Sequence, residues 1–399
     1  MLGTILQGVR VVDLTQNVAG PYCTQILGDM GAEIVKIERP GSGDDARAWK
    51  PPEVGGMSTG FAALNRNKKS VAIDIERPEG QRLVARLAAG ADVFVHSLKP
   101  GSAESRGLGD APLRAANPRL VYCAISAFGE TGPLRGLPGY DPLMQAFTGI
   151  MSVTGHEGDE PARVGVSLID MGTGMWAAMA ILAGLLQRAQ TGEGLRVHTS
   201  LLETGLAWMA VPIANHLATG RLPRKMGSGM SMMVPYELFD TEDGKVFIAA
   251  ANDRLFGCVC SALGRAELTQ DPRFADNPSR VANREALHAA LEAATRTRTT
   301  GECIERLRAA GAPCSELHDV EQVLAHEQVR AVGMVTPVAL PEAPGHRAVA
   351  LPIAVDGTRG RHPAALPLLG ADTQAVLAAL GVDAEGLAAL VRNGVVGRT

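Results

Sequence analysis

The sequence predicts an α/β protein: a large domain built on a doubly wound, parallel (Rossmann-like) sheet, and a smaller α+β domain. In the first third of the chain, short apolar runs rich in β-branched residues alternate with helical patterns, which is typical of parallel βαβ units. From about residue 221 a single strand pattern is followed by several helical ones. We therefore expect a large domain from 1–220, completed by the C-terminal segment 340–399, and a small domain with its linkers from 221–339.

Each predicted strand of the large domain is a short run that the next helical pattern interrupts. Pro21 opens the first helix, which continues to Leu27, and Pro78 opens another that reaches Ala89; proline favours the first helical turn. A further helix is predicted from 201 to 218. The predicted strands are residues 9–14, 32–38, 70–74, 91–96, 119–126 and 195–200.

The small domain begins after a Gly- and Met-rich segment, 224–235, that is typical of a loop between domains. We interpret 218–235 and 329–352 as linkers, the latter largely extended. The predicted elements that follow the first linker are a strand at 244–250, small-domain helices at 254–263, 283–295, 300–310 and 320–326, and terminal helices at 372–380 and 384–391.

Composition excludes several classes of protein. The chain has 399 residues, 46% hydrophobic and 20% charged, as expected of a soluble globular protein with more than one domain. A net charge of −4 with both signs interspersed gives no reason to expect nucleic acid or an anionic membrane as partner. The apolar run 175–186 is too short to span a bilayer. Six scattered cysteines and no visible signal peptide predict a reducing, cytoplasmic location.

Motifs for metals and tightly bound cofactors are missing from the sequence. Cys258 and Cys260 are separated by one residue, a poor zinc spacing, and are predicted to pack a helix. A dinucleotide site needs GxGxxG after the first strand, whereas 15–21 holds one glycine, although Glu38 ends the second strand where a ribose-binding acid would lie. The sequence also lacks GxxxxGK(S/T) and HExxH. We expect no metal and no permanently bound cofactor.

Asp170 precedes the long apolar run at the predicted start of a buried helix. Free backbone N–H groups and the helix dipole both stabilise a negative charge there. The residues alone leave two interpretations, an N-cap or an ionised nucleophile at neutral pH.

Several segments, in order, resemble class III CoA-transferases, the formyl-CoA transferase and carnitine CoA-transferase (CaiB/BaiF-like) family. The resemblance covers nearly the whole chain. It implies an enzyme that moves CoA from an acyl-CoA to a free carboxylic acid, with Asp170 forming an aspartyl anhydride and then an aspartyl-CoA thioester. It also implies that the large domain binds CoA and that two chains form an interlocked homodimer. The matching segments are 6–15, 19–21, 28–44, 65–70, 170–194, 235–236, 243–244, 271–274 and 367–370.

The same resemblance assigns substrate contacts. Arg39 would lie against the CoA nucleotide, and Ser97, Leu98 and Lys99 match a CoA-binding turn. Arg106 matches a second arginine of the family. The other contacts implied are Val18, Ala19, Tyr140, Asp141, Gly227 and Gly229.

Some of these residues have a simpler interpretation as well. Gly227 and Gly229 would supply a flexible cover and N–H donors for an oxyanion, or form a plain interdomain turn. Lys68 and Lys69 would pair with phosphates or lie solvated. The methionines nearby would line an adaptable pocket or pack a domain interface.

Two other functions remain open on sequence grounds. The family includes α-methylacyl-CoA racemases, which need an acid/base pair and carry His where this chain has Tyr140 before Asp141. Tyrosine is a poor base at neutral pH, so transfer is favoured. The second alternative is that the chain is a homologue that binds CoA but has lost the activity. The sequence does not name the acids, and succinyl-CoA is a family-level expectation for the donor.

Overall fold

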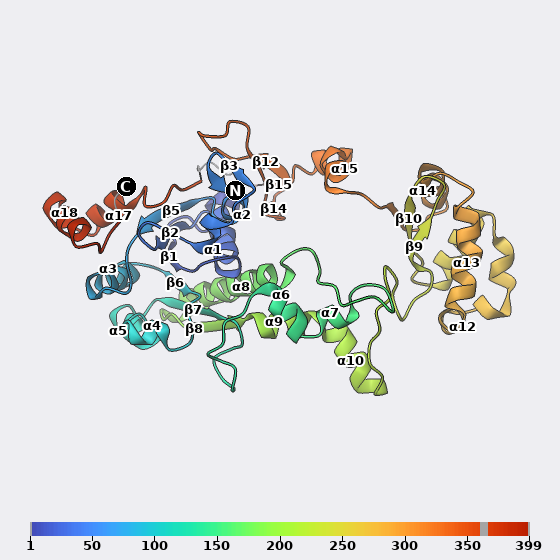
Figure 1. Cartoon of the computed structure of the whole chain (residues 1–399), viewed down its shortest axis with the longest axis horizontal. Helices are drawn as coiled ribbons and strands as arrows, with labels where there is room; N and C mark the ends of the chain where they lie inside the picture. Colours follow the sequence, from blue (N-terminus) through green and yellow to red (C-terminus); the bar gives the residue numbers. More distant parts are fainter. Residues whose placement is uncertain (1, 360–365, 398–399) are drawn as a thin grey trace. The chain divides into compact units, whose positions relative to one another are not determined.

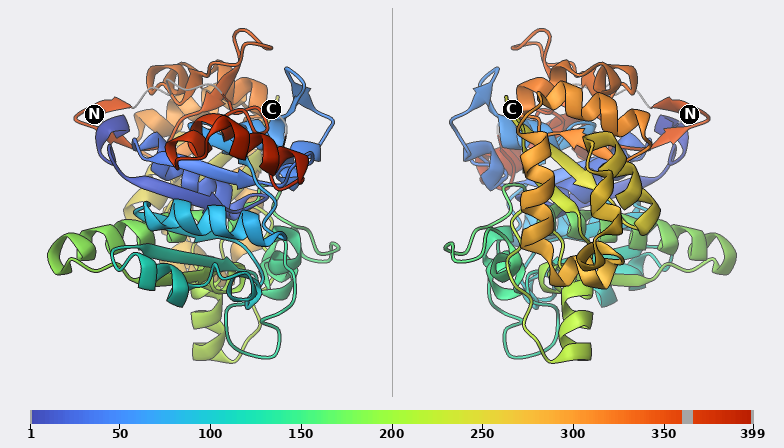
Figure 2. Two further views of the ribbon diagram at one scale, coloured as in Figure 1. Left: turned by 90° about the vertical axis from the view of Figure 1, so that its left-hand side faces the viewer. Right: turned by 90° about the vertical axis from the view of Figure 1, so that its right-hand side faces the viewer.

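The computed structural model describes residues 2–359 and 366–397 (Figures 1 and 2). Parts of the predicted C-terminal segment, 360–365 and 398–399, lie outside the described residues. The chain forms two compact units. The sheet unit comprises Met1–Gly149, Val164–Ala214 and Gln328–Thr399, and the small unit comprises Ile150–Arg163 and Asn215–Glu327. Residues 150–163 thus group with the small unit, whereas the sequence placed them in the large domain.

Within the described residues of the sheet unit, six strands form one parallel sheet, which confirms the predicted fold class. The chain order reverses between β1 and β6, so this is the topological switch point, where α/β sheets bind ligands. In spatial order the strands are β5 (Lys68–Ala72), β2 (Glu33–Glu38), β1 (Arg10–Leu14), β6 (Val93–His96), β7 (Val121–Ser126) and β8 (Arg196–Ser200).

Helices cover both faces of this sheet, because alternate strand residues point to opposite faces and both sets are apolar (Figure 1). On one face Val12 and Phe94 pack in a core with Leu83 of α3 (Pro78–Ala89) and Leu377 of α17 (Thr373–Ala379). On the other lie α1 (Ala19–Asp29) and α8 (Leu168–Thr191). Smaller elements of the unit are α2 (Thr59–Leu64), α4 (Ser102–Ser105), α5 (Asp110–Ala116), α6 (Asp141–Phe147), α9 (Leu201–Trp208), α18 (Ala384–Arg392) and the hairpin of β12 (Val335–Pro337) and β13 (Arg347–Val349).

Helix α8 is longer than the sequence indicated. It begins at Leu168, so Ser167 is the N-cap residue and Asp170 lies inside the first turn, which corrects the predicted capping role. With 24 residues, α8 is long and apolar enough to cross a membrane by length and composition alone. The length of the apolar run therefore does not exclude a membrane span, contrary to the sequence-based expectation. In this structure α8 packs against α1, α9 and the sheet strands β7 and β8.

The contact between α1 and α8 depends on a glycine. A Cβ at Gly174 would lie 2.5 Å from the carbonyl oxygen of Ala19 and 3.1 Å from the backbone nitrogen of Cys23. Backbone therefore faces backbone at this point, one turn along α8 from Asp170.

We expect Gly174→Ala to destabilise the sheet unit by about 1–3 kcal/mol, because overpacking forces the two helices apart. Urea unfolding measures the change. Gly257→Ala is the matched control: Gly257 lies within α11 (Asp253–Leu263) and a Cβ there meets nothing within 4 Å. That control is expected to gain up to about 1 kcal/mol from helix propensity. Equal effects at the two glycines would contradict this account.

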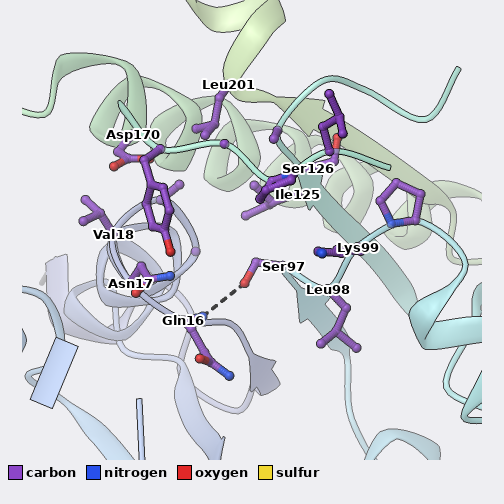
Figure 3. Close-up of a pocket in the computed structure, with 18 residues that line it drawn as sticks. Gln16, Asn17, Val18, Ser97, Leu98, Lys99, Ile125, Ser126, Asp170 and Leu201 are labelled. Carbon is purple, nitrogen blue, oxygen red and sulfur yellow. Dashed lines mark hydrogen bonds between the residues drawn. The ribbon is translucent and has the colours of Figure 1, made fainter. Parts of the chain in front are cut away.

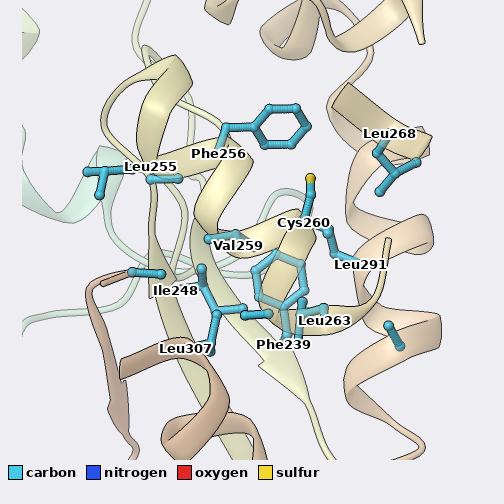
Figure 4. Close-up of a cluster of buried hydrophobic side chains, with 14 of the residues drawn as sticks. Phe239, Ile248, Leu255, Phe256, Val259, Cys260, Leu263, Leu268, Leu291 and Leu307 are labelled. Carbon is cyan, nitrogen blue, oxygen red and sulfur yellow. The ribbon is translucent and has the colours of Figure 1, made fainter. Parts of the chain in front are cut away.

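The small unit has its own core (Figure 4). Within its described residues, β11 (Cys314–Glu316), β10 (Lys245–Ala249) and β9 (Tyr236–Asp240) form an antiparallel sheet. Phe239, Phe256 and Leu291 join in the core, and Cys260 is buried there with Cys258 partly buried against it. The prediction that these cysteines pack a helix is confirmed. The helices are α7 (Ile150–Val153), α12 (Asn277–Ala282), α13 (Arg284–Thr295), α14 (Thr300–Ala309) and α15 (Val320–Ala325), with α11 as above.

The predicted helix 201–218 is two helices. α9 ends at Trp208, and α10 (Ala210–Thr219) follows after Met209. The boundary between the two units falls within α10.

Candidate active site

A cavity of about 240 Å³ opens at the carboxyl ends of β1, β6 and β7, at the switch point of the sheet (Figure 3). Three loops that directly follow these strands form much of its wall, and Asp170 reaches it from the first turn of α8. A doubly wound sheet places ligands at this location. The lining residues are Gln16, Asn17, Val18, Ala19, Gly20, Ser97, Leu98, Lys99, Pro100, Ile125, Ser126, Ala127, Leu137, Pro138, Gly139, Tyr140, Asp170 and Leu201.

The cavity brings together seven of the residues that the sequence analysis proposed. They come from four separate segments of the chain: Val18, Ala19, Ser97, Leu98, Lys99, Tyr140 and Asp170. Gln16, Asn17 and 125–127 are among the lining residues that were not predicted. A signal for them was present, because 16–17 follow the predicted strand 9–14 and 125–127 lie at the end of the predicted strand 119–126, and strand carboxyl ends share one edge of a parallel sheet.

Arg39, Arg106 and Asp141 do not line this cavity. Arg39 donates to the Gly43 carbonyl oxygen and pairs with Asp45, and Arg106 pairs with Glu76 at 2.7 Å. The contacts of the two arginines with CoA stay predictions.

Gly227 and Gly229 belong to the small unit, so a role as cover also stays a prediction. The Gly227 N–H donates to the Gly155 carbonyl oxygen, and a Cβ at Gly227 would lie 2.7 Å from the His156 ring. The loop therefore closes against the 150–163 segment of its own unit.

Both interpretations of Lys68, as a phosphate partner and as a solvated lysine, were wrong. Its ammonium is fully buried and contacts Asp13 at 3.3 Å and Asn65 at 2.8 Å, so it cannot bind a phosphate from solvent. Burial is the largest influence on Lys68 and lowers its pKa to about 8, with Asp13 opposing. Lys69 is half-exposed and pairs with Glu33.

Asp141 fixes the start of the helix that carries Asp170. Its carboxylate is buried and accepts hydrogen bonds from the backbone N–H groups of Ile169 (2.7 Å) and Asp170 (3.1 Å), and from Gln145 Nε2 (2.5 Å). Since Ser167 makes no side-chain capping bond, Asp141 satisfies the free N–H groups of the first turn from outside the helix. Asp141 is thus a positioning residue rather than part of the cavity wall.

The Asp170 carboxylate has no hydrogen-bond or ion-pair partner among the residues described here. Burial, and next the negative charge of Asp141, raise the pKa of Asp170 from 3.8 to about 7. This corrects the expectation of a fully ionised carboxylate at neutral pH: burial outweighs the favourable helix dipole. A poorly solvated carboxylate with a raised pKa is a stronger nucleophile than an exposed one, and such groups cluster at active sites.

We expect Asp170→Asn to stabilise the protein in a pH-dependent way. Between pH 4 and 7 the folded Asp170 retains a proton that the unfolded chain has lost, so wild-type stability falls as pH rises through this window. The gain of the variant should therefore grow across that window and level off above pH 7, at about 2–4 kcal/mol. Thermal unfolding from pH 4 to 8 measures it. Glu385→Gln, an exposed first-turn acid of α18, is the control without this trend; a gain independent of pH would refute the raised pKa.

No group of three or more metal-ligating side chains occurs among the residues of 2–359 and 366–397. All six cysteines are free thiols. The cytoplasmic location stays a prediction.

Fold and site together describe an α/β enzyme with an acidic group at its switch point. A family model described as CoA-transferase family III matches residues 6–373. The chain belongs to this family and is a CoA-transferase, an enzyme whose substrates are CoA thioesters.

Relatives and solved structures agree. The chain is 41% identical to succinyl-CoA:glutarate CoA-transferase of Mus musculus, covering 83% of this chain and 76% of that protein. It is 34% identical to succinate–glutarate CoA-transferase of Agrobacterium fabrum, covering 94% and 95%. A CaiB/BaiF family protein from Brucella suis aligns with TM-score 0.82 and 37% identity, covering 94% of this chain and 99% of that one.

Proposed function

We propose that this enzyme transfers CoA from succinyl-CoA to a short dicarboxylic acid such as glutarate, with Asp170 as covalent nucleophile. Relatives from mouse and Agrobacterium fabrum are named for succinyl-CoA or succinate with glutarate, and one from Acetobacter aceti for acetyl-CoA and oxalate. The observation that carries the proposal is Asp170: a partly buried carboxylate, without a hydrogen-bond or ion-pair partner among the described residues, at the wall of the switch-point cavity.

The proposed reaction passes through two covalent states on Asp170. Its carboxylate oxygen attacks the thioester carbonyl carbon, and the C–S bond breaks. CoA departs as the thiolate, and the product on Asp170 is an acyl-aspartyl anhydride. The thiolate then attacks the Asp170 carbonyl carbon and releases the donor acid, which leaves an aspartyl-CoA thioester. Splitting one difficult transfer into easier steps is the advantage of covalent catalysis.

The acceptor reverses these steps. Its carboxylate attacks the aspartyl-CoA carbonyl carbon and expels the thiolate, which attacks the acceptor's acyl carbon and frees Asp170. No proton is consumed, so Asp170 must enter the cycle ionised. Water would hydrolyse both intermediates, and the partial burial of Asp170 limits its access.

Mass spectrometry after trapping tests the proposal. The enzyme is mixed with succinyl-CoA alone, and one sample is quenched with hydroxylamine and another with borohydride. Hydroxylamine should convert activated Asp170 to a hydroxamate, and borohydride should reduce it to an alcohol, each mapped to the peptide that holds Asp170. CoA transfer to glutarate without either modification would contradict the covalent role.

The racemase alternative gains no support from the geometry. Asp141, the acid of the corresponding pair, is buried and its carboxylate accepts three hydrogen bonds from Ile169, Asp170 and Gln145. Tyr140 lines the cavity at the position where the racemases carry a histidine. Exchange of an α-proton of a branched acyl-CoA with deuterium oxide would favour the racemase instead.

We also propose that the chain acts as a homodimer. Helix α8 exposes large apolar side chains that soluble monomers rarely group together: Met171, Met175, Trp176 and Met179. One chain has a mass of 41.7 kDa, and light scattering at low protein concentration is expected to give twice this mass. The mass of a single chain would refute the dimer.

A further inference from the structure

One wall of the cavity beside Asp170 is the loop between β1 and α1, and three different side chains hold two successive peptide groups in it. The Thr15 carbonyl oxygen accepts from Lys36 Nζ at 2.9 Å. The Gln16 N–H donates to Ser97 Oγ at 3.1 Å, as drawn in Figure 3. The Asn17 N–H donates to Asp44 Oδ1 at 3.0 Å. The loop is therefore fixed from outside itself.

Lys36 and Asp44 form one unit behind this loop. Lys36 Nζ lies 2.8 Å from Asp44 Oδ2, and both side chains are fully buried. Burial by itself would lower the pKa of Lys36, but Asp13 and Asp44 outweigh it and raise the pKa, so the ammonium stays charged. A buried ion pair usually adds little stability over an apolar pair of the same shape. Stability alone therefore does not explain why Lys36 and Asp44 are buried together here.

The loop also contains a residue with an uncommon backbone conformation. Asn17 has φ of +69°, in the left-handed region that asparagine adopts more readily than other non-glycine residues. Asn17 lines the cavity, and Val18 and Ala19 follow it on the same wall. Ala19 in turn packs against Gly174, one turn of α8 from Asp170. A shift of the loop would thus move both the wall and the nucleophile's support.

We propose that Lys36 and Asp44 are positioning residues: the pair holds the β1–α1 loop in the geometry that acyl transfer at Asp170 requires. The inference rests on the proposed role of Asp170 as nucleophile. Neither side chain lines the cavity, so both act through the loop. A misplacement of about 1 Å in a catalytic site can slow the chemistry by about 100-fold.

The test compares Lys36→Met with Arg66→Met. Arg66 is also a buried cation of the sheet unit, and its guanidinium pairs with Asp29 at 2.6 Å rather than with the β1–α1 loop. Removing either cation leaves a buried carboxylate, so both variants should lose thermal stability. The measurements are kcat and KM with succinyl-CoA and glutarate, and the single-turnover rate of Asp170 labelling, at a temperature where both variants are folded.

Lys36→Met is expected to lower kcat and the labelling rate by about 100-fold while KM for succinyl-CoA changes little. Arg66→Met should keep kcat within about threefold of wild type, as for a change away from the site. Equal losses of kcat in the two variants, or none in Lys36→Met, would overturn the proposal. If Lys36→Met does not fold, Asp44→Asn is compared in its place, with a fall of about 10-fold expected for the weakened anchor.

The failures of the two proposals can be told apart. Wild-type enzyme that transfers CoA without label on Asp170 would refute the covalent role, and with it the positioning role that rests on it. Labelled wild type, together with Lys36→Met that labels as fast as Arg66→Met, would refute only the positioning role.

Discussion

Asp170→Asn should abolish CoA transfer, with kcat reduced by at least about 10⁴-fold, as for loss of a covalent nucleophile. The amide keeps the size of the side chain but cannot attack the thioester. We expect the variant to fold and, above pH 7, to be more stable than wild type, because it no longer buries a charge. Separation of succinyl-CoA from glutaryl-CoA by liquid chromatography measures the loss.

Glu385→Gln is the matched control for this activity loss, since it also removes a first-turn helix acid but lies on the exposed α18. It should leave kcat unchanged. Transfer retained in Asp170→Asn would remove Asp170 from the mechanism, whatever the stability data show. The circular dichroism spectrum of Asp170→Asn shows whether an inactive variant is folded, and so separates loss of the nucleophile from loss of the fold.

Asp141→Ala is the second change with a large expected effect. It deprives the N–H groups of Ile169 and Asp170 and the Gln145 amide of their acceptor. Unsatisfied buried donors are costly, so we expect a loss of about 3 kcal/mol in unfolding free energy. We also expect kcat to fall by about 10²–10³-fold, because the first turn of α8 no longer holds Asp170 in place. Chemical denaturation and steady-state kinetics measure the two effects.

Asp141→Asn separates positioning from charge. The amide keeps an oxygen acceptor for the helix N–H groups but removes the negative charge that contributes to the raised pKa of Asp170. The acidic limb of the kcat–pH profile should therefore move to lower pH, while kcat at pH 8 falls less than in Asp141→Ala. An unshifted profile would mean that burial alone sets the pKa of Asp170.

Much of the fold follows from local pattern. Apolar runs such as 32–38 and 91–96 predicted strands at nearly the observed positions, Glu33–Glu38 and Val93–His96. The alternation of these runs with helices permits few topologies, since parallel crossovers are right-handed. Periodicity could not place the start of α8, because 167–174 is too rich in small residues to show an apolar stripe.

Side-chain partnerships were beyond the reach of the sequence. Lys68 reads as a surface lysine, yet the fold buries it beside Asp13, 55 residues away in the chain. Asp170 was expected to be ionised from its place at a helix start, but its pKa depends on burial and on Asp141, 29 residues earlier. Both outcomes depend on long-range contacts that periodicity and spacing do not encode.

The sequence by itself determined the class of fold and the family resemblance, and it singled out Asp170 as the proposed nucleophile, because strand and helix periods and the familial motifs are local properties of the chain. Tertiary structure alone decided which charges are buried together, which loops form the cavity wall, and how the Lys36–Asp44 pair reaches the loop beside Asp170. The physical reason is that electrostatic energies depend on burial and on distance in space, and neither is fixed by separation along the chain.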